Sequence, residues 1–407
     1  MQSSAKAGSA VGPAGPAGGP AGRTVLVAFG TRPEFVKLAP VVAALKRGGT
    51  EVRTVATGQH HDLAMSDVFF EELALWPDER WKLEGDAAHR LGEMTERAER
   101  ELAEHRPHLV LVLGDTHTVP VFGLAARRAG VPVAHLESGI RSFNETSLEE
   151  VNRRVGAACA SLHLAPTELA AQFLEWEGVA RERVRVIGNP IIDLLVGLGL
   201  RRLPPSERGG VLVTAHRATN VDDRDRLASL VDLVLRLAKE VGTVTFPVHP
   251  RTARRLDEFG ETARLRADSV ELLPPLPYGE MLGALRRAAV VVTDSGGVQE
   301  EASYFGVPSV VLRRSTPRWE GVLLGSSRLV GMDVEAALGA AIEYAAPGEQ
   351  RRVAELPCPY GDGTTGVRLA GLLADPEVWS LLELREPRTP AVPEVVAAAL
   401  RSAGGPV

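Results

Sequence analysis

The sequence predicts an α/β protein made of two doubly wound, Rossmann-like domains that face each other across a cleft. Three observations predict this fold. The chain has 407 residues, more than one hydrophobic core usually covers. Short β-branched segments alternate with longer amphipathic segments, which is typical of a parallel sheet covered by helices on both faces. The strand series also restarts after residues 189–210, a segment that carries the Pro and Gly residues of a linker.

Two series of segments are expected to form the strands. The first series is residues 24–30, 51–57, 108–114, 131–137, 162–167 and 184–189. The second series is residues 210–216, 243–250, 269–275, 289–295 and 308–314. Ligands of such sheets bind beyond the carboxyl ends of the strands, so the cleft between the domains is the expected site.

The bulk composition is that of a soluble globular protein, with 44% hydrophobic residues and a net charge of -6. This mild acidity gives no electrostatic footprint for nucleic acid. Residues 1–22 are rich in Gly, Ala and Pro and lack the apolar stretch of a signal peptide, so we expect a disordered tail. No apolar run approaches the ~20 residues of a membrane span. Only Cys159 and Cys358 occur, too few for a disulfide framework, and a cytoplasmic location is expected.

Charged side chains follow several predicted strands of the first domain. Arg32 follows the first strand, and Asp115 follows the third. Glu137 ends the fourth strand and is expected to pair with Arg141, because a semi-buried carboxylate is costly without a partner. Glu149 begins a helix. Three such carboxylates predict proton transfer, whereas the alternative interpretation makes them independent helix caps and salt bridges.

The second domain carries the groups of an anion site. His216 and Arg217 follow one predicted strand, and the turn Ser295-Gly296-Gly297 follows another and opens a helix. Cationic side chains beside a helix N-terminus predict a diphosphate site.

Several other kinds of site are not predicted. No HExxH pattern accompanies the ten histidines, and the adjacent pair His60-His61 lacks metal-ligand spacing, so no metal is expected. No G-x-G-x-x-G fingerprint follows the first strand, and neither a P-loop nor a G-x-S-x-G elbow occurs, so no cofactor is expected.

The motifs, in order, resemble the UDP-N-acetylglucosamine 2-epimerase family. The matching segments are "GTRPEFVKLAP", "TGQHHDL", "GDTHT", "HLESGIRS", "LEEVNRR", "LHLAPTE", "VIGNPIIDLL", "VTAHRATNVDD", "PVHPR", "TDSGGVQEEA" and "RLVGMD". The resemblance implies the glycosyltransferase-B architecture, usually dimeric, with a C-terminal helix that crosses back to the first domain. On this basis we divide the chain into a first domain at 23–190, a second at 191–358, the returning helix at 359–375 and an extension at 376–407.

The resemblance also implies roles for individual residues. Asp115, Glu137 and Glu149 would transfer protons at C2 of the sugar, and His216 would contact the diphosphate or assist UDP departure. The substrate would be bound by Arg32, Lys37, Arg141, Arg217, His249, Met281, Ser295, Gly296, Gly297, Glu301 and Arg318. Glu301 would accept hydrogen bonds from the ribose hydroxyls, while Glu300 points elsewhere and is expected to be structural. Gln59 and His60 lie in a region that some family members use for an activating second substrate molecule.

The function implied is a nucleotide-sugar 2-epimerase that eliminates UDP to a glycal and adds it back, most simply between UDP-GlcNAc and UDP-ManNAc. The alternatives are a hydrolysing epimerase, an epimerase for another nucleotide sugar, a glycosyltransferase of the same fold, or a nucleotide-sugar sensor. The sequence departs from the family pattern around the sugar and base. Leu148 stands where Pro precedes the Glu pair, Pro190 replaces a Thr, and Met281 stands where many members have an aromatic residue.

Overall fold

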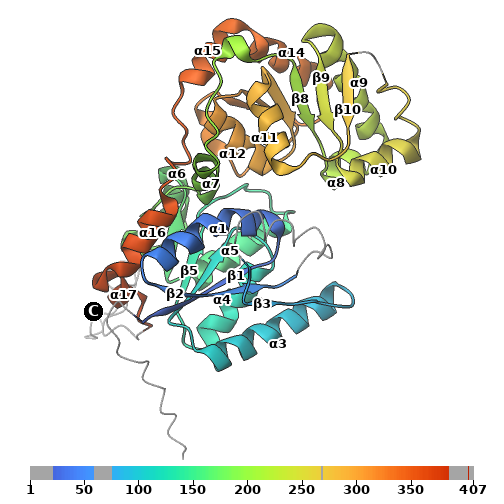
Figure 1. Ribbon diagram of the computed structural model, residues 1–407. Helices are drawn as coiled ribbons and strands as arrows, with labels where there is room; N and C mark the ends of the chain where they lie inside the picture. The colour runs from blue at the N-terminus through green and yellow to red at the C-terminus, as the bar shows by residue number, and fades with distance from the viewer. Residues whose placement is uncertain (1–21, 59–75, 267–268, 385–401, 403–407) are drawn as a thin grey trace, which may run out of the picture.

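The computed structural model describes residues 22–58, 76–266, 269–384 and 402, and contains two parallel β-sheets, each covered by helices (Figure 1). Among these residues, no helix is both long enough and apolar enough to cross a membrane. The two sheets are stacked along the long direction of Figure 1, and helices α6 and α7 lie between them.

The first sheet has seven strands in the order β3-β2-β1-β4-β5-β6-β7. Its strands are β1 (Thr24–Phe29), β2 (Glu51–Ala56), β3 (Glu79–Arg80), β4 (Leu109–Leu113), β5 (Val133–Leu136), β6 (Leu162–Ala165) and β7 (Val184–Val186). Its helices are α1 (Arg32–Arg47), α3 (Ala87–His105), α4 (Thr118–Arg128), α5 (Leu148–Cys159), α6 (Glu168–Trp176) and the 3₁₀ helix η1 (Arg181–Arg183). The order reverses between β1 and β4, which makes their carboxyl ends the expected ligand edge.

The second sheet has six strands in the order β10-β9-β8-β11-β12-β13. Its strands are β8 (Val211–Thr214), β9 (Val244–Pro247), β10 (Val270–Leu273), β11 (Val290–Thr293), β12 (Ser309–Val311) and β13 (Ser327–Leu329). Its helices are α8 (Ala218–Val221), α9 (Arg224–Glu240), α10 (Pro250–Phe259), α11 (Tyr278–Arg287), α12 (Gly296–Phe305), α13 (Trp319–Leu323), α14 (Val334–Ala345) and α15 (Pro347–Glu355).

Each predicted strand segment contains a strand of the structure, and the α/β fold with two doubly wound domains is confirmed. The prediction missed β3 and β13. Both are edge strands of two and three residues, and such short segments carry no periodic pattern of buried side chains.

The connection between the sheets is a helix rather than an extended linker. It contains α7 (Pro190–Gly197), whose Asn189 N-cap side chain accepts a hydrogen bond from the backbone N–H of Ile191, and the 3₁₀ helix η2 (Pro205–Glu207). Ile192 of α7 belongs to an apolar cluster with Val36 of α1 and Phe305 of α12. The connection therefore packs against both domains.

The chain returns to the first domain near its C-terminal end. Helices α16 (Thr365–Ala374) and α17 (Pro376–Leu382) follow α15, and α16 lies beside α1 (Figure 1). Leu369, Leu373, Val378 and Leu382 are buried in the hydrophobic core of the first sheet. The domain limits given above stay a prediction.

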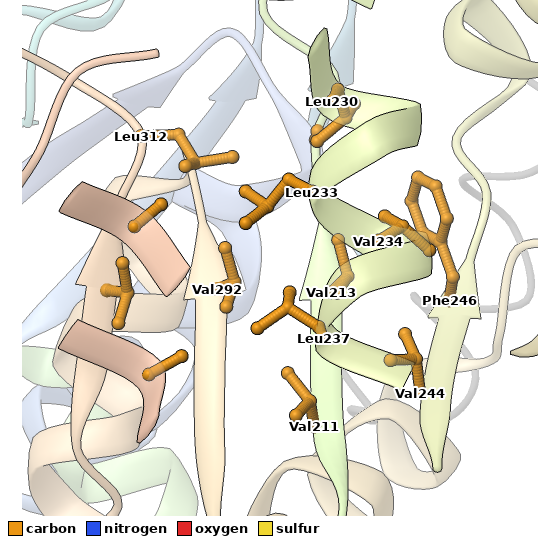
Figure 2. Close-up of a cluster of buried hydrophobic side chains, with 14 of the residues drawn as sticks. Val211, Val213, Leu230, Leu233, Val234, Leu237, Val244, Phe246, Val292 and Leu312 are labelled. Carbon is orange, nitrogen blue, oxygen red and sulfur yellow. The ribbon is translucent and has the colours of Figure 1, made fainter. Parts of the chain in front are cut away.

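The second domain has a core of buried apolar side chains between its β-strands and α9. Figure 2 shows Val211 and Val213 of β8 packing against Leu233 and Leu237 of α9. Each fully buried side chain of this kind contributes roughly 1.5–3 kcal/mol relative to an exposed one. This packing fixes the strands, and hence the loops at their carboxyl ends.

Candidate active site

The carboxyl ends of β4 and β5 place two acidic residues side by side in the first domain. Gly114 follows β4 with a φ of 76°, and Asp115 comes next. Glu137 directly follows β5. Because β4 and β5 are neighbouring parallel strands, Asp115 and Glu137 emerge at the same edge of the sheet, as the sequence predicts.

Glu137 is buried, with 6% of its surface exposed, and adopts a left-handed backbone conformation with a φ of 60°. This conformation is unfavourable for a residue other than Gly and is found most often at functional sites. Its Oε1 accepts a hydrogen bond of 2.5 Å from Nζ of Lys37 in α1. Burial raises the pKa of Glu137, but the charges of Lys37 and Arg318 outweigh this and hold the pKa below its usual value. Glu137 is therefore ionised.

The expected pairing of Glu137 with Arg141 is wrong. Arg141 is fully buried and donates from Nε and Nη2 to the two carboxylate oxygens of Glu177, at 2.8 and 2.6 Å. Its third nitrogen, Nη1, donates to the carbonyl of Ile140. The sequence offered Arg141 as the nearest cation, whereas Lys37 approaches Glu137 from a helix 100 residues away.

Asp115 pairs with Arg153 of α5. It does not cap α4, whose N-cap is His117. The Nη1 of the same arginine donates to Glu150 at 2.8 Å. Glu150 in turn accepts from the backbone N–H of Ser142 at 2.8 Å, so it fixes the loop that follows Glu137. Arg153 and Glu150 are site residues that the sequence analysis missed, although both stand inside the quoted motif "LEEVNRR".

Glu149 lies in the first turn of α5 and is exposed. Its carboxylate accepts a 2.5 Å hydrogen bond from the hydroxyl of Ser147. Desolvation raises the pKa of Glu149, but the Ser147 hydrogen bond and the charges of Arg217 and Arg153 lower it more. Since Arg217 belongs to the second domain, Glu149 faces that domain.

We call Asp115, Glu137 and Glu149 the acidic edge of the first domain. The facing anion edge of the second domain comprises His216, Arg217, Ser295, Gly296 and Gly297.

Asp294 organises the anion edge and was not among the predicted site residues. Its carboxylate is fully buried and accepts hydrogen bonds from the backbone N–H groups of His216 at 3.0 Å and Arg217 at 2.9 Å. It also accepts from Asn220 Nδ2 at 3.1 Å and lies 3.2 Å from the ring nitrogen Nδ1 of His216. The strand-end position of Asp294, directly after β11, could have identified it as a candidate site residue.

The turn after Asp294 presents backbone groups. Ser295 is the N-cap of α12, which begins at Gly296. A Cβ atom added at Gly296 or Gly297 would meet no atom within 4 Å. The first N–H groups of a helix have no intrahelical partner and attract anions. The imidazole of His216 lies beside this turn with its ring 5.3 Å from that of His249, whose pKa is lowered by burial and by His216.

Arg313 adds a further cation that the sequence analysis missed, two residues beyond strand β12. Among the described residues, no hydrogen-bond partner lies at its buried Nη1 atom. Burial lowers the pKa of Arg313 to about 10, with contributions from the like charges of Arg217, Arg318 and Arg153. Guanidinium groups within electrostatic range of one another favour an anionic ligand between them.

The predicted ribose contact, Glu301, is buried and accepts a 2.8 Å hydrogen bond from the hydroxyl of Tyr278. Burial raises the pKa of Glu301 to about 7. Arg32 of the first domain acts electrostatically on Tyr278, so it faces this part of the second domain. Met281 lies on the same helix as Tyr278 and is partly buried in the same apolar cluster.

Other predicted residues fall outside this arrangement. Gln59 and His60 lie outside the described residues. Among the residues that are described, no group of three or more His, Cys, Asp or Glu side chains could hold a metal ion.

A separate cavity of the second domain, lined by residues such as Val211, Thr245 and Arg287, lies at the amino ends of the strands.

With this geometry in place, comparison with known proteins identifies the family. Residues 43–374 match the model of the family UDP-N-acetylglucosamine 2-epimerase. The chain belongs to this family. A UDP-N-acetylglucosamine 2-epimerase of Methanocaldococcus jannaschii is 34% identical over 85% of this chain and 98% of its own length. A UDP-2,3-diacetamido-2,3-dideoxy-D-glucuronate 2-epimerase of Pseudomonas aeruginosa is 35% identical over 86% of this chain and 99% of its own length.

Solved structures of family members share the fold. The crystal structure of the M. jannaschii enzyme in complex with UDP-GlcNAc and UDP is 32% identical and has a TM-score of 0.75, with 86% of this chain and 99% of that chain covered. The S. aureus MnaA-UDP structure is 30% identical and has a TM-score of 0.78, with 90% of this chain and 100% of that one covered. The predicted glycosyltransferase-B fold and the family resemblance are thus confirmed.

Proposed function

We propose that this family member is a non-hydrolysing nucleotide-sugar 2-epimerase that interconverts UDP-GlcNAc and UDP-ManNAc. One observation carries the proposal: the three carboxylates of the acidic edge lie within electrostatic range of cations from the second domain. This arrangement suits a substrate whose diphosphate is held by the second domain while its sugar ring lies over the first. The relatives that bind UDP-GlcNAc and UDP support this choice of substrate.

The reaction divides between the two edges. An ionised carboxylate, for which Glu137 is suited, takes the proton from C2 of the sugar and becomes a carboxylic acid. The C1–O bond breaks, its electron pair leaves with UDP, and a C1=C2 double bond forms. A proton then returns to the opposite face of C2 from the protonated form of Asp115 or Glu149, which takes that proton from solvent, as UDP adds back to C1. Glu137 releases its own proton to solvent, which completes the cycle. UDP departs as an anion, and the helix N-terminus with Arg217 and Arg313 stabilises the charge that develops.

A second candidate substrate is an acidic nucleotide sugar. The buried, unpartnered Nη1 of Arg313 favours it, since a sugar carboxylate would add a partner for a guanidinium group. The P. aeruginosa relative carries a glucuronate substrate in its name, and this chain departs from the family pattern around the sugar.

The decisive experiment is NMR of the purified protein with a panel of UDP-, CMP-, GDP- and dTDP-sugars in D₂O, including a UDP-uronate. Deuterium at C2 in both nucleotide-linked epimers is expected from UDP-GlcNAc. Stoichiometric free sugar and UDP would instead identify a hydrolysing enzyme. If no sugar of the panel exchanged its C2 hydrogen, the proposal would be wrong.

We further propose a homodimer, independent of metal and located in the cytoplasm. Exposed apolar side chains from three adjacent helices, Leu91 of α3, Leu124 of α4 and Val151 of α5, support a subunit interface. Two free cysteines fit a reducing compartment. Light scattering would report a dimer, and activity is expected to survive EDTA.

A further inference from the structure

Glu300, in helix α12 of the second domain, joins the two domains through a buried ion-pair network. Its side chain is fully buried. Its Oε2 accepts a hydrogen bond from Lys37 Nζ at 3.1 Å, and its Oε1 accepts one from Asn189 Nδ2 at 2.8 Å. The same Oε1 lies 2.5 Å from Nε of Arg318. The expectation that Glu300 is merely structural is therefore incomplete, because one of its partners also holds Glu137.

Lys37 is that shared partner. Its ammonium nitrogen lies 2.5 Å from Glu137 of the first domain and 3.1 Å from Glu300 of the second. Burial lowers the pKa of Lys37, but the two carboxylates raise it more, and the group stays charged. With Arg318, the network contains two positive and two negative buried groups, so each charge depends on the others for compensation.

We propose that Glu300 is a positioning residue for the reaction. It holds the Lys37 ammonium between the two domains, so that this one cation is shared by the Glu137 and Glu300 carboxylates. The inference rests on the proposed epimerase function. Without the Glu300 charge, Lys37 would be committed to Glu137, whose carboxylate would then be a weaker base. Contact between Lys37 and Glu300 also requires the two domains to be together, which links the strength of the base to domain contact.

Other charged and titratable groups surround the network. Among the described residues they are Glu34, Asp115 and His135 in the first domain and Tyr278, Glu301, Glu320, Cys358 and Tyr360 around it in the rest of the chain. The charge of Glu300 raises the pKa of Glu301 and of Cys358. The Glu301→Gln control therefore shows how much of a change in pH dependence runs through Glu301.

The test compares Glu300→Gln with the neighbouring variant Glu301→Gln in the full-length protein. C2 hydrogen exchange of UDP-GlcNAc in D₂O is followed between about pH 5 and 9, and UDP affinity is measured by calorimetry. For Glu300→Gln we expect kcat to fall at least about tenfold while KM and UDP affinity change less than about threefold. The acidic limb of its kcat profile should move to lower pH, because loss of a nearby negative charge favours ionised Glu137. Glu301→Gln should instead raise KM and leave that limb in place.

The outcomes separate a positioning role from a structural one. A lower melting temperature with unchanged kcat and an unchanged acidic limb would overturn the inference. If Glu300→Gln does not fold, Glu300→Asp decides: it keeps the charge but shortens the reach, so kcat should fall several-fold with the acidic limb retained, and a normal kcat would contradict the proposal. Absence of exchange by the wild-type protein would overturn the epimerase function together with this inference. Exchange by the wild type with an identical Glu300→Gln profile would overturn the role of Glu300 alone.

Discussion

The acidic edge of the first domain and the anion edge of the second are built from different groups. At the acidic edge the polar groups belong to side chains, and each carboxylate already has a partner: Arg153 at Asp115, Lys37 at Glu137 and Ser147 at Glu149. At the anion edge the Ser295-Gly296-Gly297 turn presents backbone N–H groups. The buried carboxylate of Asp294 holds the neighbouring loop by accepting hydrogen bonds from the backbone of His216 and Arg217. From this contrast we expect substitutions at the first edge to lower turnover, and substitutions at the second edge to lower the affinity for UDP.

The largest effect is expected from Glu137→Gln. The amide keeps the size of the side chain but cannot take a proton, so turnover should fall by on the order of 10³ while UDP affinity stays close to wild type. Asp115→Asn and Glu149→Gln should likewise lower turnover and leave UDP affinity close to that of the wild type. Steady-state kinetics and calorimetry measure the two quantities. The matched control is Glu101→Gln, which likewise removes a buried carboxylate paired with a basic side chain, here Arg53, but between α3 and β2. Near-normal rates for all three variants would contradict the site.

The next effect separates binding from folding at the anion edge. Gly297→Leu places a side chain where no atom lies within 4 Å, so the fold should tolerate it while the diphosphate is displaced. UDP affinity should fall by on the order of 100-fold, with little change in melting temperature. Gly339→Leu in α14 is the control, because its Cβ also meets nothing within 4 Å and its helix does not carry the site. Equal losses of affinity in the two variants would argue against a phosphate turn.

How much of this site the sequence could predict differs between the two edges. Strand-end position and residue type identified Asp115 and Glu137, because parallel strands bring their carboxyl ends together whatever the details of packing. Partner choice could not be predicted in this way. Lys37 reaches Glu137 through the packing of α1 on the sheet, and Arg141 is taken by Glu177 of the segment after α6. Such pairings depend on side-chain directions that neither spacing nor periodicity encodes.

Asp294 and Arg313 follow strands, as Asp115 does, so the sequence gives their positions. It does not give the roles of the two side chains, because those depend on the loops that pack around them. The edge strands β3 and β13 were missed for a different reason, because two or three residues show no alternation. The overall fold was predictable because short apolar strand segments recur between amphipathic helices along the chain, whereas the site depends on single residues.

A smaller effect tests Asp294, the group that supports the anion edge. Asp294→Asn replaces one carboxylate oxygen by a donor facing the N–H groups of His216 and Arg217, which both need an acceptor. Loss of one such charged hydrogen bond costs about 1.5–3 kcal/mol in unfolding free energy. We expect kcat/KM to fall roughly tenfold because His216 is displaced. Urea unfolding and kinetics measure the two effects. A stable variant with normal kinetics would show that Asp294 does not position these residues.

The smallest expected effect is a dependence of UDP affinity on pH that comes from Glu301. Burial raises its pKa to about 7 in the free protein, so near that pH the carboxyl is partly protonated. Ribose hydroxyls that donate to Glu301 favour the ionised form, and binding would therefore lower its pKa and release a proton. Affinity should then rise as the pH increases through about 7, by a few-fold. Calorimetry in buffers of different ionisation enthalpy measures the released proton directly.

UDP itself also titrates near neutral pH, so Glu301→Gln provides the control. The part of the proton release that this substitution abolishes belongs to Glu301. If the variant released as many protons as the wild type, Glu301 would not accept the ribose hydroxyls, and the second domain would bind its nucleotide by backbone groups and cations alone.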